Sequence, residues 1–140
     1  RYIGRTFITP GQQSREQAVR IKLGPLKSCV EGRRVVMIDD SIVRGTTSRQ
    51  IVTLLREAGA TEIHMRSSAP PFIAPCHFGT DIPDRENLIA CRYSVEEIRQ
   101  LIGADSLGFL SLEDLHRIAP DAACGFCDGC FTGTYPLSCS

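Results

Sequence analysis

The sequence predicts an α/β domain built on a parallel sheet, because short apolar strands alternate with amphipathic helices. The run "RRVVMID" (33–39) is typical of a buried strand, and "TEIHMRSSA" (61–69) is typical of the next one. Between them, residues 46–60 place Ile51 and Leu55 on one helical face before Gly59 ends the pattern. Strand, helix and strand follow one another within about 35 residues, which is a βαβ unit with parallel strands.

The remaining elements are predicted by helix caps and short apolar runs. The helix expected at 94–103 opens with a capping box of Ser94 and Glu97, in which each side chain bonds to the backbone N–H of the other residue. Further elements are a capped helix at 14–26, a strand at 106–110 and a capped helix at 111–119.

Composition divides the chain into three parts. Residues 1–33 begin as a loop with a Pro-Gly turn and continue into the first helix. Residues 34–119 hold the alternating strands and helices. Residues 120–140 contain four of the seven cysteines and show no helix periodicity. We therefore treat 120–140 as a cysteine-rich C-terminal tail.

Composition also restricts the class of protein. The chain has 140 residues, 42% of them hydrophobic, which is enough for the core of one domain. It contains no apolar run of membrane-spanning length and no signal-peptide pattern, so we expect a cytoplasmic protein without a membrane partner. An odd count of seven cysteines argues for reduced or metal-bound thiols instead of a disulfide framework. Because the chain begins with Arg1 and has no initiator Met, we expect it to be a piece of a longer or processed chain.

A net charge of zero conceals an asymmetry along the chain. Residues 1–34 carry eight basic and two acidic side chains, and the remainder is acidic. A basic segment indicates a polyanionic partner, either nucleic acid or a phosphorylated small molecule. A solvated helix face explains the same charges equally well.

The stretch "VVMIDDSIVRGTTS" (35–48) carries the strongest chemical signal. Ligands of open α/β sheets bind beyond the carboxyl ends of the strands, where Asp39 and Asp40 are expected. The turn at 41–47 leads into a helix N-terminus, whose backbone N–H groups form an anion cradle, and Gly45 permits the backbone geometry that such a turn needs. Two carboxylates repel phosphate but hold Mg²⁺ or contact sugar hydroxyls. The stretch therefore predicts a ligand that has a phosphate together with a sugar or a magnesium–pyrophosphate group.

The tail contains a second chemical signal, the run "CGFCDGC". It spaces Cys124, Cys127 and Cys130 three residues apart, as in iron–sulfur proteins and also in zinc sites. Three thiols this close in a loop indicate metal ligands more than packing residues. The spacing alone leaves iron–sulfur and zinc open.

The stretch at 35–48 resembles the phosphoribosyl-pyrophosphate motif of type I phosphoribosyltransferases. Together with "RYIGRTFITPGQQSREQAVRIKL" before it and "SVEEIRQLIGADSLGFLSLEDL" after it, the chain closely resembles the amidophosphoribosyltransferase family. Members of that family are glutamine-dependent enzymes that catalyse the first committed step of de novo purine synthesis. The resemblance implies a partial type I phosphoribosyltransferase fold with a cysteine-rich tail. It corresponds to the last part of the family's enzyme, without the glutaminase domain and the first half of the transferase domain.

The resemblance also implies roles for individual residues. It assigns Asp39 and Asp40 to the ribose and to the magnesium–pyrophosphate group. It likens residues 1–13 to a flexible catalytic loop that closes over the substrate. The residues that it assigns to the closed site and ammonia channel are Tyr2, Arg5 and Ile8, and those that it assigns to the 5-phosphate are Ser41, Ile42, Val43, Arg44, Gly45, Thr46 and Thr47.

For the cysteines, the resemblance is to the family members that carry a [4Fe–4S] cluster. It matches ligands at Cys76, Cys127 and Cys130, with the fourth family ligand upstream of Arg1. Cys124 is then a neighbour of the cluster and not a ligand.

The expected reaction of the intact enzyme is displacement of pyrophosphate from phosphoribosyl pyrophosphate by glutamine-derived ammonia. Its expected partners are the glutaminase domain and further copies of itself, without nucleic acid, and the fragment alone should be inactive. One alternative is a salvage transferase for a purine base, which would need a hood over the base. Another is a non-enzymatic protein. A DNA-binding helix pair would indicate a regulator, and bound zinc would indicate an interaction module.

Overall fold

The computed structural model describes residues 27–137 and contains a three-stranded parallel sheet. The strand order is β1-β2-β3, with Arg34 of β1 opposite Glu62 of β2 and His64 of β2 opposite Ser106 of β3. The strands are β1 (Arg34–Asp39), β2 (Glu62–Ser67) and β3 (Ser106–Phe109). The parallel α/β class predicted from the alternating pattern is therefore confirmed.

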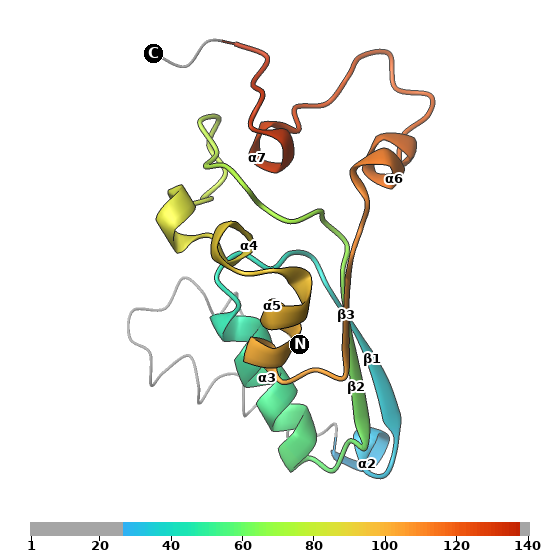
Figure 1. Ribbon diagram of the computed structural model, residues 1–140. Coiled ribbons are helices and arrows are strands. Elements are labelled where there is room, and N and C mark those ends of the chain that lie inside the picture. The colour runs from blue at the N-terminus through green and yellow to red at the C-terminus, as the bar shows by residue number, and fades with distance from the viewer. Residues whose placement is uncertain (1–26, 138–140) are drawn as a thin grey trace.

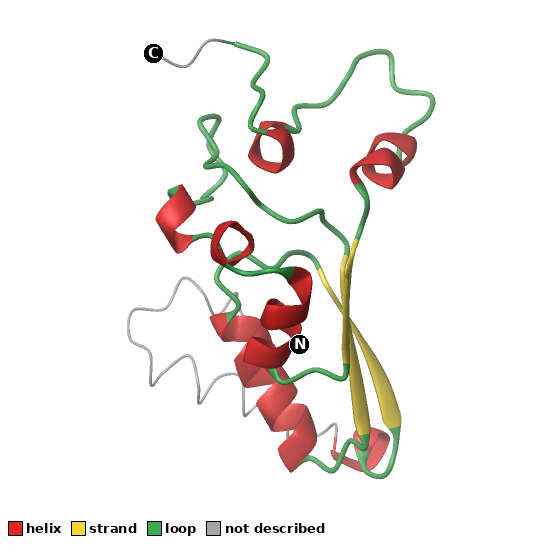
Figure 2. Cartoon of the chain, viewed as in Figure 1, coloured by secondary structure: helices red, strands yellow, loops and turns green. Residues whose placement is uncertain are grey.

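Helices cover one face of this sheet and lie beyond the carboxyl ends of its strands. Figure 2 shows α3, α4 and α5 on the same side of the strands, and Figure 1 shows α6 and α7 past the ends at which the strands finish. The helices are α2 (Lys27–Val30), α3 (Thr46–Glu57), the 3₁₀ helix η3 (Arg85–Asn87), α4 (Ile89–Arg92), α5 (Val95–Ile102), α6 (Leu112–Arg117) and α7 (Gly129–Thr132).

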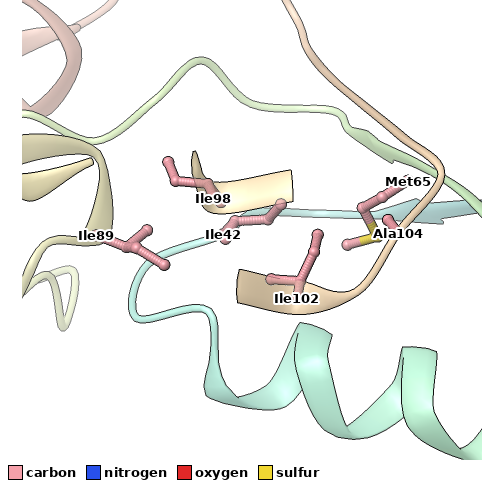
Figure 3. Close-up of a cluster of buried hydrophobic side chains, with 6 residues drawn as sticks. All are labelled: Ile42, Met65, Ile89, Ile98, Ile102 and Ala104. Atoms are coloured by element: carbon pink, nitrogen blue, oxygen red, sulfur yellow. The ribbon is translucent and has the colours of Figure 1, made fainter. Parts of the chain in front are cut away.

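The core lies between β2 and the helices. Ile63 and Met65 of β2 have no exposed surface, because alternate side chains of a strand point to the same face. One cluster joins Ile63 to α3, and a second joins Met65 to α4, α5 and the turn after β1. Figure 3 shows this second cluster, which consists of Ile42, Met65, Ile89, Ile98, Ile102 and Ala104.

The opposite face of β1 is open. Val36 is 63% exposed and Ile38 is 74% exposed, although both are large apolar residues in a strand. Within residues 27–137, no helix lies on this side of the sheet (Figure 2). Parallel sheets usually have both faces covered, so β1 presents a face that is suited to packing against further protein.

The caps and boundaries follow the sequence prediction closely, and the short helices do not. Ser94 and Glu97 form the predicted capping box at the start of α5, and Ser111 caps α6 through the N–H of Asp114. The helices α2, α4 and α7 were not predicted, because one turn is too short to show a hydrophobic period. The helix expected at 14–26 lies outside the described residues.

Membrane insertion would require a long apolar helix. Among residues 27–137, none of the helices combines the length and the apolar character needed to cross a bilayer.

The packing of α5 gives a direct test of the core. Ile98 is 1% exposed, whereas Leu101 on the same helix is 43% exposed. Ile98→Ala should lower the free energy of unfolding by about 3 kcal/mol, because it leaves a cavity in the core. Leu101→Ala should cost about 0.5 kcal/mol. Chemical denaturation of both variants measures the difference, and equal losses would contradict this packing.

Candidate functional site

The two acidic residues stand where β1 ends. Asp39 is the last residue of β1, and its side chain accepts a hydrogen bond from the N–H of Asp40 (3.0 Å). The Ser41 hydroxyl donates to the Asp40 carboxylate (3.2 Å). Ser68, just after β2, donates its N–H (2.9 Å) and its hydroxyl (3.1 Å) to the carbonyl of Asp39. The ends of two neighbouring strands are thus joined, and both carboxylates lie beside this junction.

The electrostatics of the pair favour a cation. Partial burial raises the pKa of Asp39, and the nearby charge of Asp40 raises it further. The ionised form of Asp39 is therefore disfavoured while no positive charge lies beside it. A divalent cation would remove this cost, and carboxylate oxygens are ligands that Mg²⁺ prefers.

The turn that follows the two aspartates is attached to the hydrophobic core. Ile42 is 2% exposed and packs in the cluster with Ile89 and Ile98 (Figure 3). The carbonyl of Val43 accepts a hydrogen bond from the N–H of Ile89 (2.9 Å). The turn is therefore fixed to α4 and α5 by both a side chain and its backbone.

Gly45 shapes the end of the turn and the start of α3. Its φ of 76° lies in the left-handed region, and a Cβ at this position would lie 2.6 Å from Cδ1 of Ile89. As the N-cap of α3, Gly45 supplies no side-chain acceptor for the first N–H groups of the helix. Thr46 and Thr47, the first residues of α3, are exposed. This arrangement leaves a helix N-terminus facing solvent, the geometry that suits an anion.

A cavity of about 310 Å³ adjoins this helix N-terminus. Arg44, Gly45 and Arg49 line it from the turn and α3, and Arg92 lines it from α4. Within the described part of the chain, neither Arg44 nor Arg49 forms an ion pair. Glu86 of η3 also lines the cavity, so cationic side chains outnumber one carboxylate next to the exposed start of α3.

The structure brings the predicted residues 39–47 together at one end of the sheet. Tyr2, Arg5 and Ile8 lie outside the described residues. Sequence reasoning did not find Arg49 and Arg92, because only the fold brings α3 and α4 to the same cavity. A cationic residue one turn into a helix was the available signal for Arg49.

The cysteines form a second grouping, around the segment that follows β2. The carbonyl of Cys130 in α7 accepts hydrogen bonds from the N–H groups of Ile73 (2.9 Å) and Ala74 (3.1 Å). Cys76 and Cys130 both pack against a small core of Phe72, Ile82 and Leu88. Two cysteines that lie far apart in the sequence thus meet on one cluster. Cys124 and Cys127 are exposed in the loop before α7.

The two packed cysteines have different environments. The N–H of Phe78 donates to the sulfur of Cys76 (3.4 Å), and this contact, with further hydrogen bonds from Thr80 and Gly79, lowers the pKa of the Cys76 thiol. Burial raises the pKa of Cys130, and nearby negative charge at Cys76 and Cys127 raises it too. A positive centre beside these two cysteines would favour the ionised form of both thiols.

Neither grouping is a complete metal site by itself. Among residues 27–137, no three His, Cys, Asp or Glu side chains are close enough together to hold a metal ion. The donors that are present are the carboxylate pair at 39–40 and the sulfurs of Cys76 and Cys130. Further ligands would have to come from substrate, from water or from other protein.

Known proteins with similar sequences decide the family. No protein-family model matches the chain. Amidophosphoribosyltransferase of Bacillus subtilis is 61% identical over 97% of this chain, which corresponds to 29% of that protein. The enzyme of the same name from Archaeoglobus fulgidus is 54% identical over 99% of this chain and 31% of its own length, and the chloroplastic one from Glycine max is 54% identical over 97% and 24%.

The fold agrees with these sequences. The solved structure of glutamine phosphoribosylpyrophosphate amidotransferase from B. subtilis, complexed with ADP and GMP, matches with a TM-score of 0.73 and 56% identity. The match covers 97% of this chain and 31% of that one. The chain belongs to the amidophosphoribosyltransferase family. It spans less than a third of the length of these relatives.

In this chain the acid pair, the anchored turn and the uncapped helix start lie in one continuous stretch, residues 39–47. Its strand order and parallel pairing match the part of the phosphoribosyltransferase fold that the resemblance implies. The family resemblance proposed from the motifs is confirmed.

Gly45 gives the sharpest structural test of the turn. Gly45→Ala should reduce the free energy of unfolding through both its left-handed φ and its contact with Ile89. Gly32 is a matched control, because its φ is 71° and no atom lies within 4 Å of a Cβ built there. We expect Gly45→Ala to cost about 1 kcal/mol more than Gly32→Ala in chemical denaturation.

A second substitution separates the two effects at Gly45. Ile89→Val removes the Cδ1 atom that the new Cβ would meet. Combined with Gly45→Ala, it should reduce the extra cost. If Gly45→Ala and Gly32→Ala are equally destabilising, the close packing of the turn on α4 is wrong.

Asp39 predicts a pH dependence of stability. The pKa of Asp39 is raised in the folded state, so its ionisation is less favourable there than in the unfolded chain. The free energy of unfolding is therefore highest below the unfolded value of 3.8, where Asp39 is protonated in both states, and it falls as the pH rises through the folded-state value. In metal-free buffer at neutral pH, Asp39→Asn should therefore be more stable than the wild type, and at acidic pH the gap should shrink. Mg²⁺ should stabilise the wild type more than the variant. Denaturation curves at both pH values measure this, and a variant less stable than wild type at neutral pH without metal would contradict it.

Proposed function

We propose that the protein to which this segment belongs transfers the phosphoribosyl group of phosphoribosyl pyrophosphate to ammonia, the first committed step of purine biosynthesis. The nitrogen of ammonia forms a bond to C1 of the ribose, and the bond from C1 to the pyrophosphate oxygen breaks. Pyrophosphate leaves with the electron pair, and the nitrogen loses a proton to give phosphoribosylamine. Hydrolysis of glutamine supplies the ammonia and releases glutamate.

One observation carries this proposal. A pair of carboxylates and an uncapped helix N-terminus lie at opposite ends of a single turn, and the turn is fixed to the core by Ile42 and Val43. Phosphoribosyl pyrophosphate has the matching features, a phosphate at one end of a ribose and a pyrophosphate at the other.

On this proposal, residues 41–47 bind the 5-phosphate. The backbone N–H groups at the start of α3 would donate to its oxygens, and the hydroxyls of Ser41, Thr46 and Thr47 would add further donors. Gly45 has no Cβ, which allows the backbone to approach Ile89 closely. The cationic wall formed by Arg44 and Arg49 would favour a doubly charged ligand in this region.

Asp39 and Asp40 would bind the ribose hydroxyls and hold Mg²⁺ with the pyrophosphate. The raised pKa of Asp39 supports this role, because the carboxylate is poised for a positive partner. When bound, Mg²⁺ would supply positive charge to the departing pyrophosphate. The acids would orient C1 toward the ammonia, which reduces the entropy lost in reaching the transition state.

The remaining parts follow from the family resemblance. Residues 1–33 would form the catalytic loop and the helix after it, with Tyr2, Arg5 and Ile8 closing the site against water. Residues 34–119 would be the end of the transferase domain, and 120–140 would be the cluster-binding tail. We further propose a homo-oligomeric, cytoplasmic enzyme that has a glutaminase domain and binds no nucleic acid.

The acids test the function directly. In the full-length protein, Asp39→Asn with Asp40→Asn should reduce phosphoribosyl transfer by at least about a thousandfold, because ribose and metal contacts are lost together. Glutamine hydrolysis should remain detectable, since these residues do not contact glutamine. Glu113→Gln with Asp114→Asn is a control that removes two exposed carboxylates on α6. Transfer near the wild-type rate in the Asp39/Asp40 variant would exclude this site.

We also propose that the tail carries ligands of a [4Fe–4S] cluster. The observations that support it are the meeting of Cys76 and Cys130 on one core and the backbone N–H bond to the sulfur of Cys76, which favours a thiolate ligand. Cys127 would be the third ligand, and the fourth would come from protein outside this chain. When bound, the cluster would cross-link the tail to the segment after β2.

Metal analysis distinguishes this cluster from zinc. The full-length protein, purified without oxygen, should be brown and contain about four irons and four sulfides per chain. Cys127→Ser should remove the colour and lower the stability, because the tail loses its anchor. Cys124→Ser is the matched control and should do neither. Zinc in place of iron, or colour lost only in Cys124→Ser, would overturn this ligand set.

A further inference from the structure

We propose that Tyr135 is a positioning residue that clamps the segment carrying Cys76 onto the helix carrying Cys130. The inference extends the proposed cysteine site and rests on it for its purpose, although the contacts themselves do not depend on a metal. Three independent contacts place Tyr135 in this role. They involve its hydroxyl, its ring and a glycine that accommodates the ring.

The hydroxyl and the ring of Tyr135 bind the segment on both sides of Cys76. The hydroxyl donates a hydrogen bond to the carbonyl of Pro75 (2.5 Å), across 60 residues of sequence. The ring packs edge-on against His77, with centroids 4.7 Å apart and an interplanar angle of 69°. The ring of Phe78 also lies beside the Tyr135 ring, with centroids 6.2 Å apart. Residues before and after Cys76 are therefore held by one side chain.

Gly129 provides the space for that ring. A Cβ at Gly129 would lie 2.4 Å and 2.6 Å from two ring atoms of Tyr135, and 3.2 Å from the carbonyl oxygen of Thr134. Gly129 is the first residue of α7 and directly precedes Cys130. The backbone of the ligand-bearing helix and the ring of Tyr135 are thus in direct contact, which only glycine permits.

The turn after α7 returns Tyr135 to this position. Gly133 ends the helix with a φ of 77°, in the left-handed region. The N–H of Thr134 then donates to the hydroxyl of Thr132 (3.2 Å). This reversal carries the chain back across Gly129, so that the side chain of Tyr135 lies over the start of its own helix.

A second contact holds the other end of the same interface. Phe72 and Phe131 pack with ring centroids 4.8 Å apart, and the carbonyl of Cys130 accepts the N–H groups of Ile73 and Ala74. Tyr135 acts beyond these contacts, at Pro75 and His77. The first set of contacts holds residues 72–74, and Tyr135 holds the residues on both sides of Cys76, so together they fix the segment that carries Cys76 relative to Cys130.

The test uses Gly129→Ala in the full-length protein, because alanine favours the helix yet displaces the ring. Hydrogen exchange of the N–H groups of residues 73–78 should rise by about tenfold, while exchange in β2 and the denaturation midpoint change little. Gly125→Ala is the matched control, since no atom lies within 4 Å of a Cβ there. Tyr135→Leu should reproduce the effect, and Tyr135→Phe should give a smaller one because the ring remains.

A second control and a second measurement separate this inference from the proposed cluster. Phe126→Leu changes an aromatic residue of the same tail that is 59% exposed, and should leave exchange at residues 73–78 unchanged. Iron retention against a chelator should fall in Gly129→Ala and Tyr135→Leu. A wild-type protein without iron would refute the cluster while the exchange experiment still tests the clamp. Exchange at residues 73–78 that is unchanged in both Gly129→Ala and Tyr135→Leu would refute the clamp.

Discussion

The candidate site depends on the burial of one side chain, Ile42, beneath the turn between β1 and α3. Ile42 packs with residues from β2, α4 and α5, so the turn is attached to the same core that holds the sheet and helices together (Figure 3). The carboxylates before Ile42 and the helix N-terminus after it are therefore held at a fixed separation. A site that is fixed before the ligand arrives loses less entropy on binding, so this fixed separation would favour a ligand whose two ends match the carboxylates and the helix N-terminus.

Within residues 27–137, the strand that ends in this site is uncovered on its other face. Val36 and Ile38 of β1 are exposed there, which is unusual for a parallel sheet. The chain spans 31% or less of the relatives to which it is similar, so most of the length of an amidophosphoribosyltransferase lies outside it. The exposed apolar face of β1 is where additional protein of that kind would pack. Such packing would add to the rigidity of the strand that ends in Asp39.

Local sequence signals predicted the fold class and the location of the turn. They did not predict features that depend on contacts between distant parts of the chain. The capping box of Ser94 and Glu97 and the apolar run of β1 depend on nearby residues, so they can be recognised in the sequence. The helix α7 was missed because a single turn is too short to show a hydrophobic period. The approach of Arg92 to the cavity depends on how α4 packs, which no local pattern encodes. The tail was predicted from cysteine spacing, but its attachment through Tyr135 was not.

The central claim is that the acids and the turn form one site for the two ends of phosphoribosyl pyrophosphate. The most direct measurement is a crystal structure of the full-length protein with phosphoribosyl pyrophosphate and Mg²⁺. We predict that the 5-phosphate accepts hydrogen bonds from the N–H groups of residues 44–47. The ribose and the metal-bound pyrophosphate should lie on the side of Asp39 and Asp40. A ligand bound in the reverse direction, or one that does not contact this turn, would contradict the account.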